Sequence, residues 1–236
     1  LPTDVFYVGV KSEDHQGAEF SLITISTDLP FEEDVNGRKR LLGFPITAVI
    51  PDGTPNDPAA ATLMAIGLSA NRVQRVVVDS VIHHENMGDL FGILSHNRVY
   101  TVLNNHDSGF NNTTLTNFVY NYSYDDSFYA GLTNQVTDGP GSLVNYAGYR
   151  MTGPWIFQQI DDAGVHSGTN LLFNIWIDPI QDGLLPGVAF TGTVSDIPKV
   201  YPIDIPSGVT NLIVRIAPRN GEPLIVSLRK DLIPTP

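Results

Sequence analysis

Short apolar segments of five to ten residues recur along the whole chain, each bounded by turn-forming residues. Apolar and polar residues alternate in several of them, which is the period of a half-buried β-strand, and a helical period is nearly absent. The expected strands are Val5–Val10, Phe20–Ile25, Ile46–Ile50, Val73–Ile82, Leu90–Leu94, Val99–Leu103, Trp155–Ile160, Leu171–Ile177, Val209–Ile216 and Leu224–Leu228. The chain is therefore predicted to be an all-β protein.

Turn signals separate the expected strands at regular intervals, as in β-sandwiches and jelly rolls. They are Asn36-Gly37, Pro51-Asp52-Gly53, Asp138-Gly139-Pro140-Gly141, Asp182-Gly183 and Asn220-Gly221. Val76-Val77-Val78 is apolar on both faces and is expected in a central strand. The alanine-rich stretch Pro58–Leu68 is the single candidate for a helix, with a strand at Thr62–Leu68 as the alternative.

Three segments are expected. Residues 1–30 form a strand–turn–strand pair, residues 42–178 form a jelly-roll β-sandwich, and residues 196–236 form another strand pair. The charged stretch Phe31–Arg40 is interpreted as a linker, and Leu185-Pro186-Gly187 as part of a connector. The flanking strands are expected to form a second, smaller sandwich or to pair between subunits.

Charge and composition exclude several classes of function. The chain carries 25 acidic and 13 basic residues, a formal net charge of −12, which repels phosphate backbones and argues against nucleic-acid binding. It has no cysteine, so disulfides and Cys-ligated zinc are excluded. No apolar run reaches the ~20 residues of a membrane span. The first residue is Leu1, so we expect a processed product or a piece of a longer protein.

The central segment carries an ordered series of motifs. They are Val76–His84, Gly88–Ser95, Asp125-Asp126-Ser127, Gly153–Asp161 and Gly168–Ile177. Together they resemble the P domain of subtilisin-type proprotein convertases, over about 100 residues. Ser95-His96 departs from the family's Ser-Pro at this point. The resemblance implies a jelly-roll fold without catalytic residues, accompanying a separate catalytic domain.

The two ends resemble the halves of another family, the bacterial pre-peptidase C-terminal domain, in inverted order. Asp4–Val10 and Ala18–Leu22 are similar to its last strands, whereas Tyr201–Leu212 and Pro223–Lys230 are similar to its first half. Two complementary halves can pair within one chain, or the end of one copy can pair with the start of the next. The second arrangement builds filaments when the rotation between copies does not close.

Catalytic motifs are missing from the sequence. We find no Gly-x-Ser-x-Gly, no His-Glu-x-x-His and no phosphate-binding loop, so the chain is predicted not to be an enzyme. His83-His84-Glu85 with Asp89 is a candidate site for a transition metal. Neighbouring residues of a strand point to opposite faces, however, so the favoured interpretation is one packed and one solvated histidine.

Paired carboxylates near turns are the candidates for calcium. They are Asp125, Asp126, Asp161 and Asp162, with Asp52-Asn56-Asp57 as a weaker group. Calcium takes carboxylate and backbone carbonyl oxygens, and both are available at turns. The alternative is that these carboxylates are solvated or accept hydrogen bonds from local backbone amides.

Aromatic residues alternate through Phe118, Tyr120, Tyr122 and Tyr124, followed by Phe128 and Tyr129. Exposed tyrosines stack on sugars and anchor protein partners, so Tyr120, Tyr122 and Tyr124 are candidate interaction residues. The same alternation also describes one face of a strand, for which packing in the core is the alternative. Glycosylation sequons begin at Asn111, Asn112 and Asn121.

The favoured prediction from the sequence is a non-catalytic module located outside the cell or at the surface of a bacterium. It either assembles with copies of itself into a filament or surface layer, or accompanies a secreted protease. A carbohydrate-binding module is the runner-up, because jelly rolls commonly bind glycans. A secreted hydrolase of unrecognised type is the third alternative.

Overall fold

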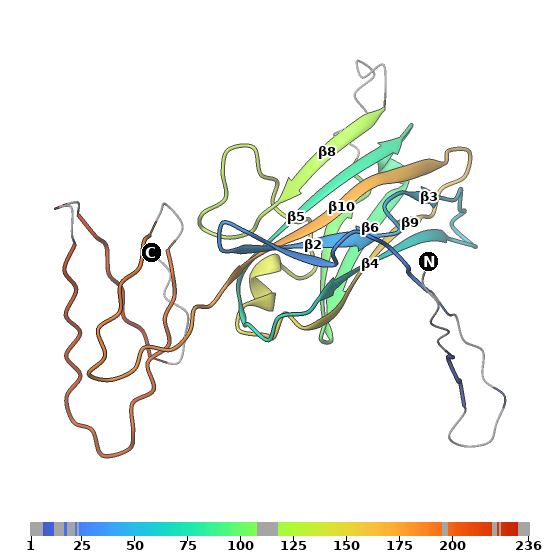
Figure 1. Ribbon diagram of the computed structural model, residues 1–236. Helices are drawn as coiled ribbons and strands as arrows, with labels where there is room; N and C mark the ends of the chain where they lie inside the picture. Colours follow the sequence, from blue (N-terminus) through green and yellow to red (C-terminus); the bar gives the residue numbers. More distant parts are fainter. Residues whose placement is uncertain are drawn as a thin grey trace.

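The computed structural model describes residues 7–11, 17, 22, 24–107, 118–194, 198–218, 221 and 223–230. In these residues there are ten β-strands and no α-helix (Figure 1). The strands are β1 Glu32–Val35, β2 Arg38–Phe44, β3 Ala48–Ile50, β4 Ala59–Gly67, β5 Val73–His84, β6 Leu90–His96, β7 Val99–Asn105, β8 Val119–Tyr124, β9 Gly153–Asp161 and β10 Gly168–Pro179. This part of the chain contains no helix suited to crossing a bilayer.

The strands form one continuous antiparallel sheet in the order β7-β6-β9-β4-β2-β10-β5-β8, with β1 added to β2 and β3 to β10. Strand β2 belongs to both layers. Its residues 39–42 pair with β10, whereas Gly43 and Phe44 pair with β4. The sheet bends over at this point and is nearly barrel-shaped. The predicted all-β sandwich is therefore confirmed for residues 32–179, which we call the sandwich.

The bend requires a glycine in β2. A Cβ atom added to Gly43 would lie 2.4 Å from Cδ1 of Phe173 and 2.7 Å from its carbonyl oxygen. Phe173 in turn stacks on Phe157 with ring centroids 4.7 Å apart, which joins the two layers through the core. A larger side chain at position 43 would push these layers apart, so the close approach of backbone and ring depends on Gly43.

The alternation of apolar and polar residues in the sequence corresponds to an alternation of buried and more exposed side chains in the strands. Strand β4 alternates buried and half-buried residues along Ala61–Gly67, and β9 alternates covered with more exposed residues along Trp155–Asp161. The predicted strands at Ile46–Ile50, Val73–Ile82, Leu90–Leu94, Val99–Leu103, Trp155–Ile160 and Leu171–Ile177 are confirmed with small changes of boundary. The candidate helix at Pro58–Leu68 is wrong and its alternative, a strand, is found as β4.

The interpretation of Phe31–Arg40 as a linker is also wrong. Its charges face one another across the β1–β2 hairpin, where Asp34 pairs with Lys39 at 3.1 Å and Glu33 pairs with Arg40. Asn36 and Gly37 take φ angles of 56° and 82°, the left-handed conformation of a tight hairpin turn. Opposite charges on directly opposed residues stabilise a strand pair. The charged stretch Phe31–Arg40 therefore forms a hairpin and not a linker.

A loop between β8 and η3 (Leu143–Tyr146) covers backbone at both open edges of the sheet. Gln135 donates its N–H to the carbonyl of Ser123 on β8 at 2.9 Å. On the other side Gly139 donates to Val102 of β7 at 3.1 Å, and the carbonyl of Pro140 accepts from the same residue at 3.1 Å. Exposed sheet edges invite pairing with other chains, and this loop blocks part of each edge.

The described residues of the expected terminal strands form no strand within the single chain. Val209–Ile216 and Leu224–Leu228 have no strand partner among the described residues, and neither do residues 7–10 of Val5–Val10. Phe20–Ile25 lies largely outside the described residues. A strand needs a neighbour to accept and donate its backbone hydrogen bonds, and the sandwich offers none to these segments. The described residues of the two ends therefore form no second sandwich.

Candidate interaction surface

The tyrosines of β8 lie in the core. Tyr120, Tyr122 and Tyr124 are between 3% and 5% exposed, and the rings of Tyr122 and Tyr124 stack with centroids 5.3 Å apart. Burial raises the pKa of all three hydroxyl groups. The prediction that they form an exposed interaction surface is therefore wrong, and the alternative of core packing is what the structure contains. Their ring faces are not available to a sugar or a partner.

Asp125 and Asp126 are adjacent in sequence and have different partners. Asp125 is fully buried and forms an ion pair with Arg75 of β5. Burial opposes its charge, but hydrogen bonds from Arg75 and Ser127 outweigh that effect and lower its pKa below the usual 3.8. The guanidinium of Arg75 thus helps to hold this carboxylate ionised.

Asp126 organises the loop that closes the sheet edges. Its carboxylate accepts hydrogen bonds from the backbone and hydroxyl of Thr137 at 2.8 and 2.7 Å. It also accepts from the hydroxyl of Ser142 and the backbone of Leu143, both at 2.7 Å. Four donors therefore surround this carboxylate, and calcium would have to displace them. The local alternative, in which the carboxylate binds backbone amides, describes this site.

Asp161 and Asp162 are also adjacent in sequence and contact different histidines. Asp161 Oδ2 lies 3.1 Å from Nε2 of His84, and both side chains are fully buried. Burial is the main influence on Asp161 and raises its pKa above the usual 3.8, although His84 and a backbone amide favour its ionised form. Asp162 is part-exposed and lies 3.0 Å from Nε2 of His106. The two carboxylates do not face a common site.

The histidines of β5 point to opposite faces, as the strand period predicts. His84 is buried, whereas His83 is half-buried. Asp89 contacts Nδ1 of His166 at 2.9 Å and accepts a hydrogen bond from Asn86 at 2.6 Å. Across the described ranges no three His, Asp or Glu side chains are grouped to hold a metal ion. Binding of calcium stays a prediction without a preformed cluster in this part of the chain.

The remaining sequence candidates have partners of their own in the described residues. Asp52 accepts a hydrogen bond from the backbone of Val165 at 3.0 Å, and the backbone of Asp57 pairs with Thr54. Asn111 and Asn112 lie outside the described residues. Asn121 is exposed on β8, so its sequon is accessible in the folded chain.

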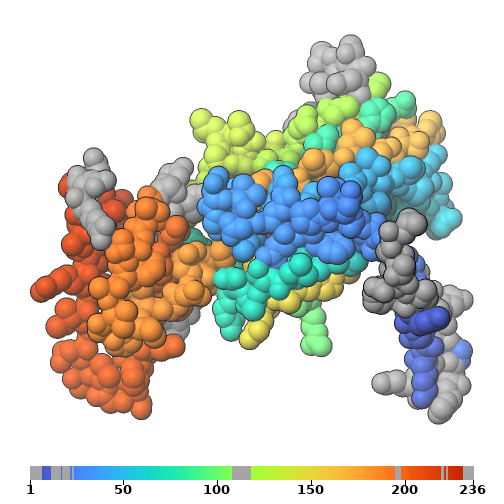
Figure 2. Space-filling view, in the orientation of Figure 1, coloured from blue at the N-terminus to red at the C-terminus, as the bar shows by residue number. Residues whose placement is uncertain are grey.

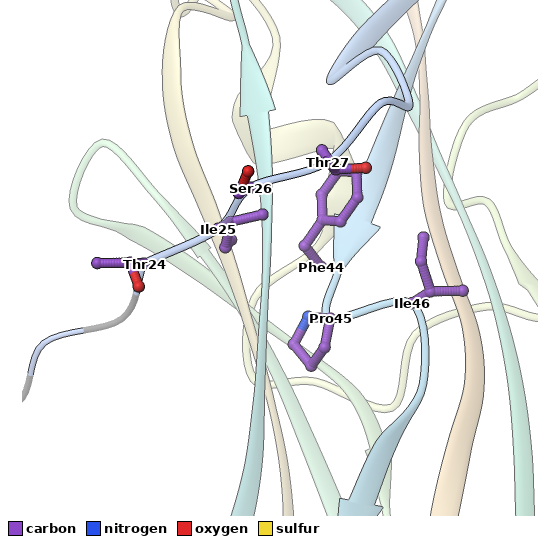
Figure 3. A pocket seen from close by; sticks show the side chains of 7 residues that line it. All are labelled: Thr24, Ile25, Ser26, Thr27, Phe44, Pro45 and Ile46. Carbon is purple, nitrogen blue, oxygen red and sulfur yellow. The ribbon is translucent and has the colours of Figure 1, made fainter. Parts of the chain in front are cut away.

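One shallow pocket of about 390 Å³ lies where the N-terminal segment passes the loop after β2 (Figure 3). It is lined by Thr24, Ile25, Ser26, Thr27, Phe44, Pro45 and Ile46. The lining contains methyl groups, one aromatic ring and hydroxyl groups, but no acid, base or histidine. It therefore lacks the paired groups that general acid–base or nucleophilic catalysis requires.

Many exposed apolar side chains lie in the C-terminal arm, which we define as residues 180–230. Leu212, Val214, Leu224 and Val226 are between 41% and 57% exposed, and Ile213 and Ile225 are 89% and 97% exposed. All buried hydrophobic residues of the described chain lie between Leu41 and Ile177, within the sandwich. The arm is thus rich in strand-forming residues, and its described residues add nothing to the core.

Backbone contacts hold the base of the C-terminal arm. Ile180 donates to the carbonyl of Arg72 at 2.8 Å, and Gln74 donates from its side chain to the carbonyl of Pro198 at 2.6 Å. Further along, Gln181 donates to the carbonyl of Val200 at 3.0 Å. These contacts fix where the arm leaves the sandwich. No local signal in the sequence predicts them, because the partners are far apart along the chain, 124 residues in the case of Gln74 and Pro198.

The N-terminal arm, defined as residues 1–30, also carries exposed apolar side chains. Tyr7 is 91% exposed, and Val8, Val10 and Leu22 are all more than half exposed. Figures 1 and 2 show the described parts of this arm and the C-terminal arm on opposite sides of the sandwich. The two arms of one molecule therefore cannot meet in this structure without a large rearrangement.

Family models and curated proteins were compared with the chain. No protein-family model matches the chain, and no curated protein matches it either. The resemblances to a P domain and to a pre-peptidase C-terminal domain therefore stay predictions.

Proposed function

We propose that this protein is a structural subunit of an extracellular assembly, in which copies join head to tail through their arms. The N-terminal arm of one copy would complete the strand set of the C-terminal arm of the next. The single observation that carries the proposal is the pair of arms with exposed apolar side chains on opposite sides of the sandwich (Figure 1).

Two segments of the C-terminal arm lack strand partners among the described residues. Val209–Ile216 and Leu224–Leu228 have the composition of strands, yet the described sandwich offers them no neighbour. Large exposed apolar patches on a folded protein mark surfaces that bind a partner. Two strands alone are at best marginally stable in water, and a third strand with an apolar face makes such a unit stable. A strand donated by another chain supplies both hydrogen bonds and apolar contact.

The geometry favours another molecule as the donor. In one chain the sandwich lies between the two arms (Figure 2). A contact between different surfaces of identical copies repeats indefinitely unless the rotation closes a ring. Head-to-tail joining would therefore give filaments or sheets. The inverted order of the two halves that resemble a pre-peptidase C-terminal domain supports the same arrangement.

No specific observation favours the other candidates. The tyrosines that suggested a carbohydrate-binding face are buried, and the pocket beside Pro45 carries no catalytic pair. An accessory role beside a secreted protease requires no exposed arms. The non-catalytic, self-assembling subunit is therefore the function that the described residues support best.

The test compares the full chain with two variants over a range of concentrations, using light scattering and electron microscopy. The arm variant carries Ile213→Asp and Ile225→Asp, which place charges on the apolar surface of the C-terminal arm. The control carries Leu132→Asp and Phe128→Asp, two exposed residues of the sandwich loops. We expect the natural chain and the control to assemble and the arm variant to remain monomeric. A natural chain that stays a monodisperse monomer at high concentration would refute the proposal.

A further inference from the structure

The C-terminal arm consists of two parts that differ in burial. Ile180, Leu184 and Tyr201 are half-buried, whereas every described residue from Asp204 to Lys230 is exposed. We call residues 180–202 the collar, and the residues after Ile203 the acceptor segment. Figure 1 shows the collar continuing from the end of β10 and the acceptor segment extending beyond it.

Hydrogen bonds attach the collar to the start of β5. The N–H of Ile180 donates to the carbonyl of Arg72 at 2.8 Å, and the side chain of Gln74 donates to the carbonyl of Pro198 at 2.6 Å. Arg72 and Gln74 flank Val73, which is fully buried in the core. Both anchor points therefore belong to the packed part of the sandwich.

Further hydrogen bonds close the collar on itself. The N–H of Gln181 donates to the carbonyl of Val200 at 3.0 Å, and the N–H of Leu184 donates to the carbonyl of Pro202 at 2.9 Å. The first and last residues of the collar thus lie side by side. Because the first of them continues directly from β10, the end of the collar is held at a defined place on the sandwich.

A ring contact supports the same arrangement. Phe190 and Tyr201 pack with ring centroids 5.1 Å apart, and burial raises the pKa of the Tyr201 hydroxyl. A Cβ atom added to Gly192 would lie 2.8 Å from Cε1 of Phe190, so the backbone passes close to this ring. The middle of the collar is therefore folded onto its end.

The acceptor segment makes no comparable contacts. In residues 204–218, all of which the structure describes, the hydrogen bonds are local. The N–H of Val209 donates to the carbonyl of Pro206 at 3.3 Å, and Asn211 donates to the hydroxyl of Thr210 at 3.2 Å. No hydrogen bond of this range reaches the collar or the sandwich, so its backbone groups are available to another chain.

We infer that the acceptor segment alone receives the N-terminal arm of the next copy, and that the collar sets the angle between successive copies. This inference rests on the proposed function and adds which part of the arm forms the joint and which part orients it. The collar makes its hydrogen bonds within the molecule. The acceptor segment instead carries apolar side chains that no described residue covers, with Ile213 89% and Ile225 97% exposed.

The orienting role follows from repetition. In a series of identical copies joined head to tail, one relation between neighbours recurs at every joint. The acceptor segment follows the collar along the chain, so a collar fixed on β5 gives every joint the same angle and the filament a regular repeat. A loosened collar would act as a hinge, and the joints would then differ in angle.

The first experiment places charges on exposed apolar residues of each part of the arm in the full chain. Leu185 and Val188 of the collar are 68% and 63% exposed. We expect Leu185→Asp with Val188→Asp to assemble like the natural chain in light scattering. We expect Ile213→Asp with Ile225→Asp to remain monomeric. The two variants have the same net charge, so charge alone cannot account for a difference between them.

The second experiment loosens the collar. Gln74→Glu replaces the donor that faces the carbonyl of Pro198 with a carboxylate that cannot donate. Gln158→Glu, at an exposed position of β9, is the control with the same change of charge. We expect electron microscopy to show that Gln74→Glu still forms filaments but loses their regular repeat, while the control retains it. Tyr201→Ala, which removes the contact with Phe190, should cause the same loss.

The outcomes separate this inference from the proposed function. The melting temperature of the sandwich should be unchanged in Gln74→Glu and Tyr201→Ala, so that irregular filaments report on the collar and not on unfolding. Regular filaments from both variants would overturn the orienting role and leave head-to-tail joining intact. Loss of assembly in the variant with Leu185→Asp and Val188→Asp would place the joint on the collar as well. A natural chain that never assembles would remove both the inference and the proposed function.

Discussion

Arg75 and Asp125 form a buried ion pair that ties the start of β5 to the loop after β8. The side chain of Arg75 is 10% exposed and that of Asp125 is fully covered. Arg75 also contacts Asp178 of β10 at 3.2 Å, so a single guanidinium joins three parts of the sandwich. Asp125 was a calcium candidate in the sequence. In the structure its carboxylate contacts a cation of the chain itself, the guanidinium of Arg75.

Asp125→Asn should destabilise the sandwich by about 3 kcal/mol, because it leaves a buried guanidinium with reduced compensation. This loss of stability lies at the low end of the range for breaking a buried ion pair, since Arg75 keeps its contact with Asp178. Urea unfolding followed by circular dichroism measures the change. Asp34→Asn is the control, since that exposed partner of Lys39 should cost less than about 1 kcal/mol. Equal losses of stability in the two variants would contradict the stabilising role of the Arg75–Asp125 pair.

The stability of the sandwich should fall on acidification. Hydrogen bonds and the charge of Arg75 lower the pKa of Asp125 below its usual 3.8 in the folded state, although burial opposes this. A lowered folded-state pKa gives stability that is present above the unfolded-state pKa and is lost as pH falls through the folded-state value. Thermal unfolding at a series of pH values should therefore show a decline that begins at about pH 4. Asp125→Asn should flatten this decline, and an unchanged profile would count against the pair.

Removal of calcium should leave the melting temperature of the sandwich unchanged. The carboxylate of Asp126 already accepts four hydrogen bonds, and that of Asp125 is paired with Arg75. A ligand raises the melting temperature only if it binds the folded state. Differential scanning calorimetry with a chelator and with added calcium measures this. A clear rise with calcium that disappears in Asp126→Asn would place a calcium site at this loop.

Tyr122→Ala should act on stability and not on glycan binding. The ring is 5% exposed and stacks on Tyr124, so its removal leaves a cavity expected to cost about 3–5 kcal/mol. Chemical unfolding of the variant gives the loss of stability. A surface substitution such as Tyr100→Ala, on the exposed side of β7, serves as control. Full stability combined with lost binding on a glycan array would revive the carbohydrate-binding alternative.

Residues 31–179 expressed alone should fold as a monomer with the melting temperature of the full chain. Every buried hydrophobic residue of the described chain lies within this range, so the arms contribute no core. Size-exclusion chromatography with light scattering gives the mass, and calorimetry gives the melting temperature. A fragment that unfolds or aggregates would show that the arms support the sandwich and are not reserved for another copy.

The sequence by itself determined the all-β class and most strand positions, because a period of two is a local property of neighbouring residues. It correctly placed β5, β6, β7, β9 and β10, and it identified the opposite orientation of His83 and His84. The apolar segments and the glycine-rich turns between them were sufficient for these predictions. Even so, the charged hairpin of β1 and β2 was missed, since charge alone resembles a linker until the facing strand is known.

Only the tertiary structure decided which side chains meet across large separations. Arg75 and Asp125 are 50 residues apart, His84 and Asp161 are 77 apart, and no local pattern links them. Burial of Tyr122 likewise depends on what packs over β8. The lack of a partner for Val209–Ile216 could be seen only once the described sandwich left it without a neighbour. Strand composition is encoded in the segment, whereas the partner of a strand is supplied by the rest of the fold or by another molecule.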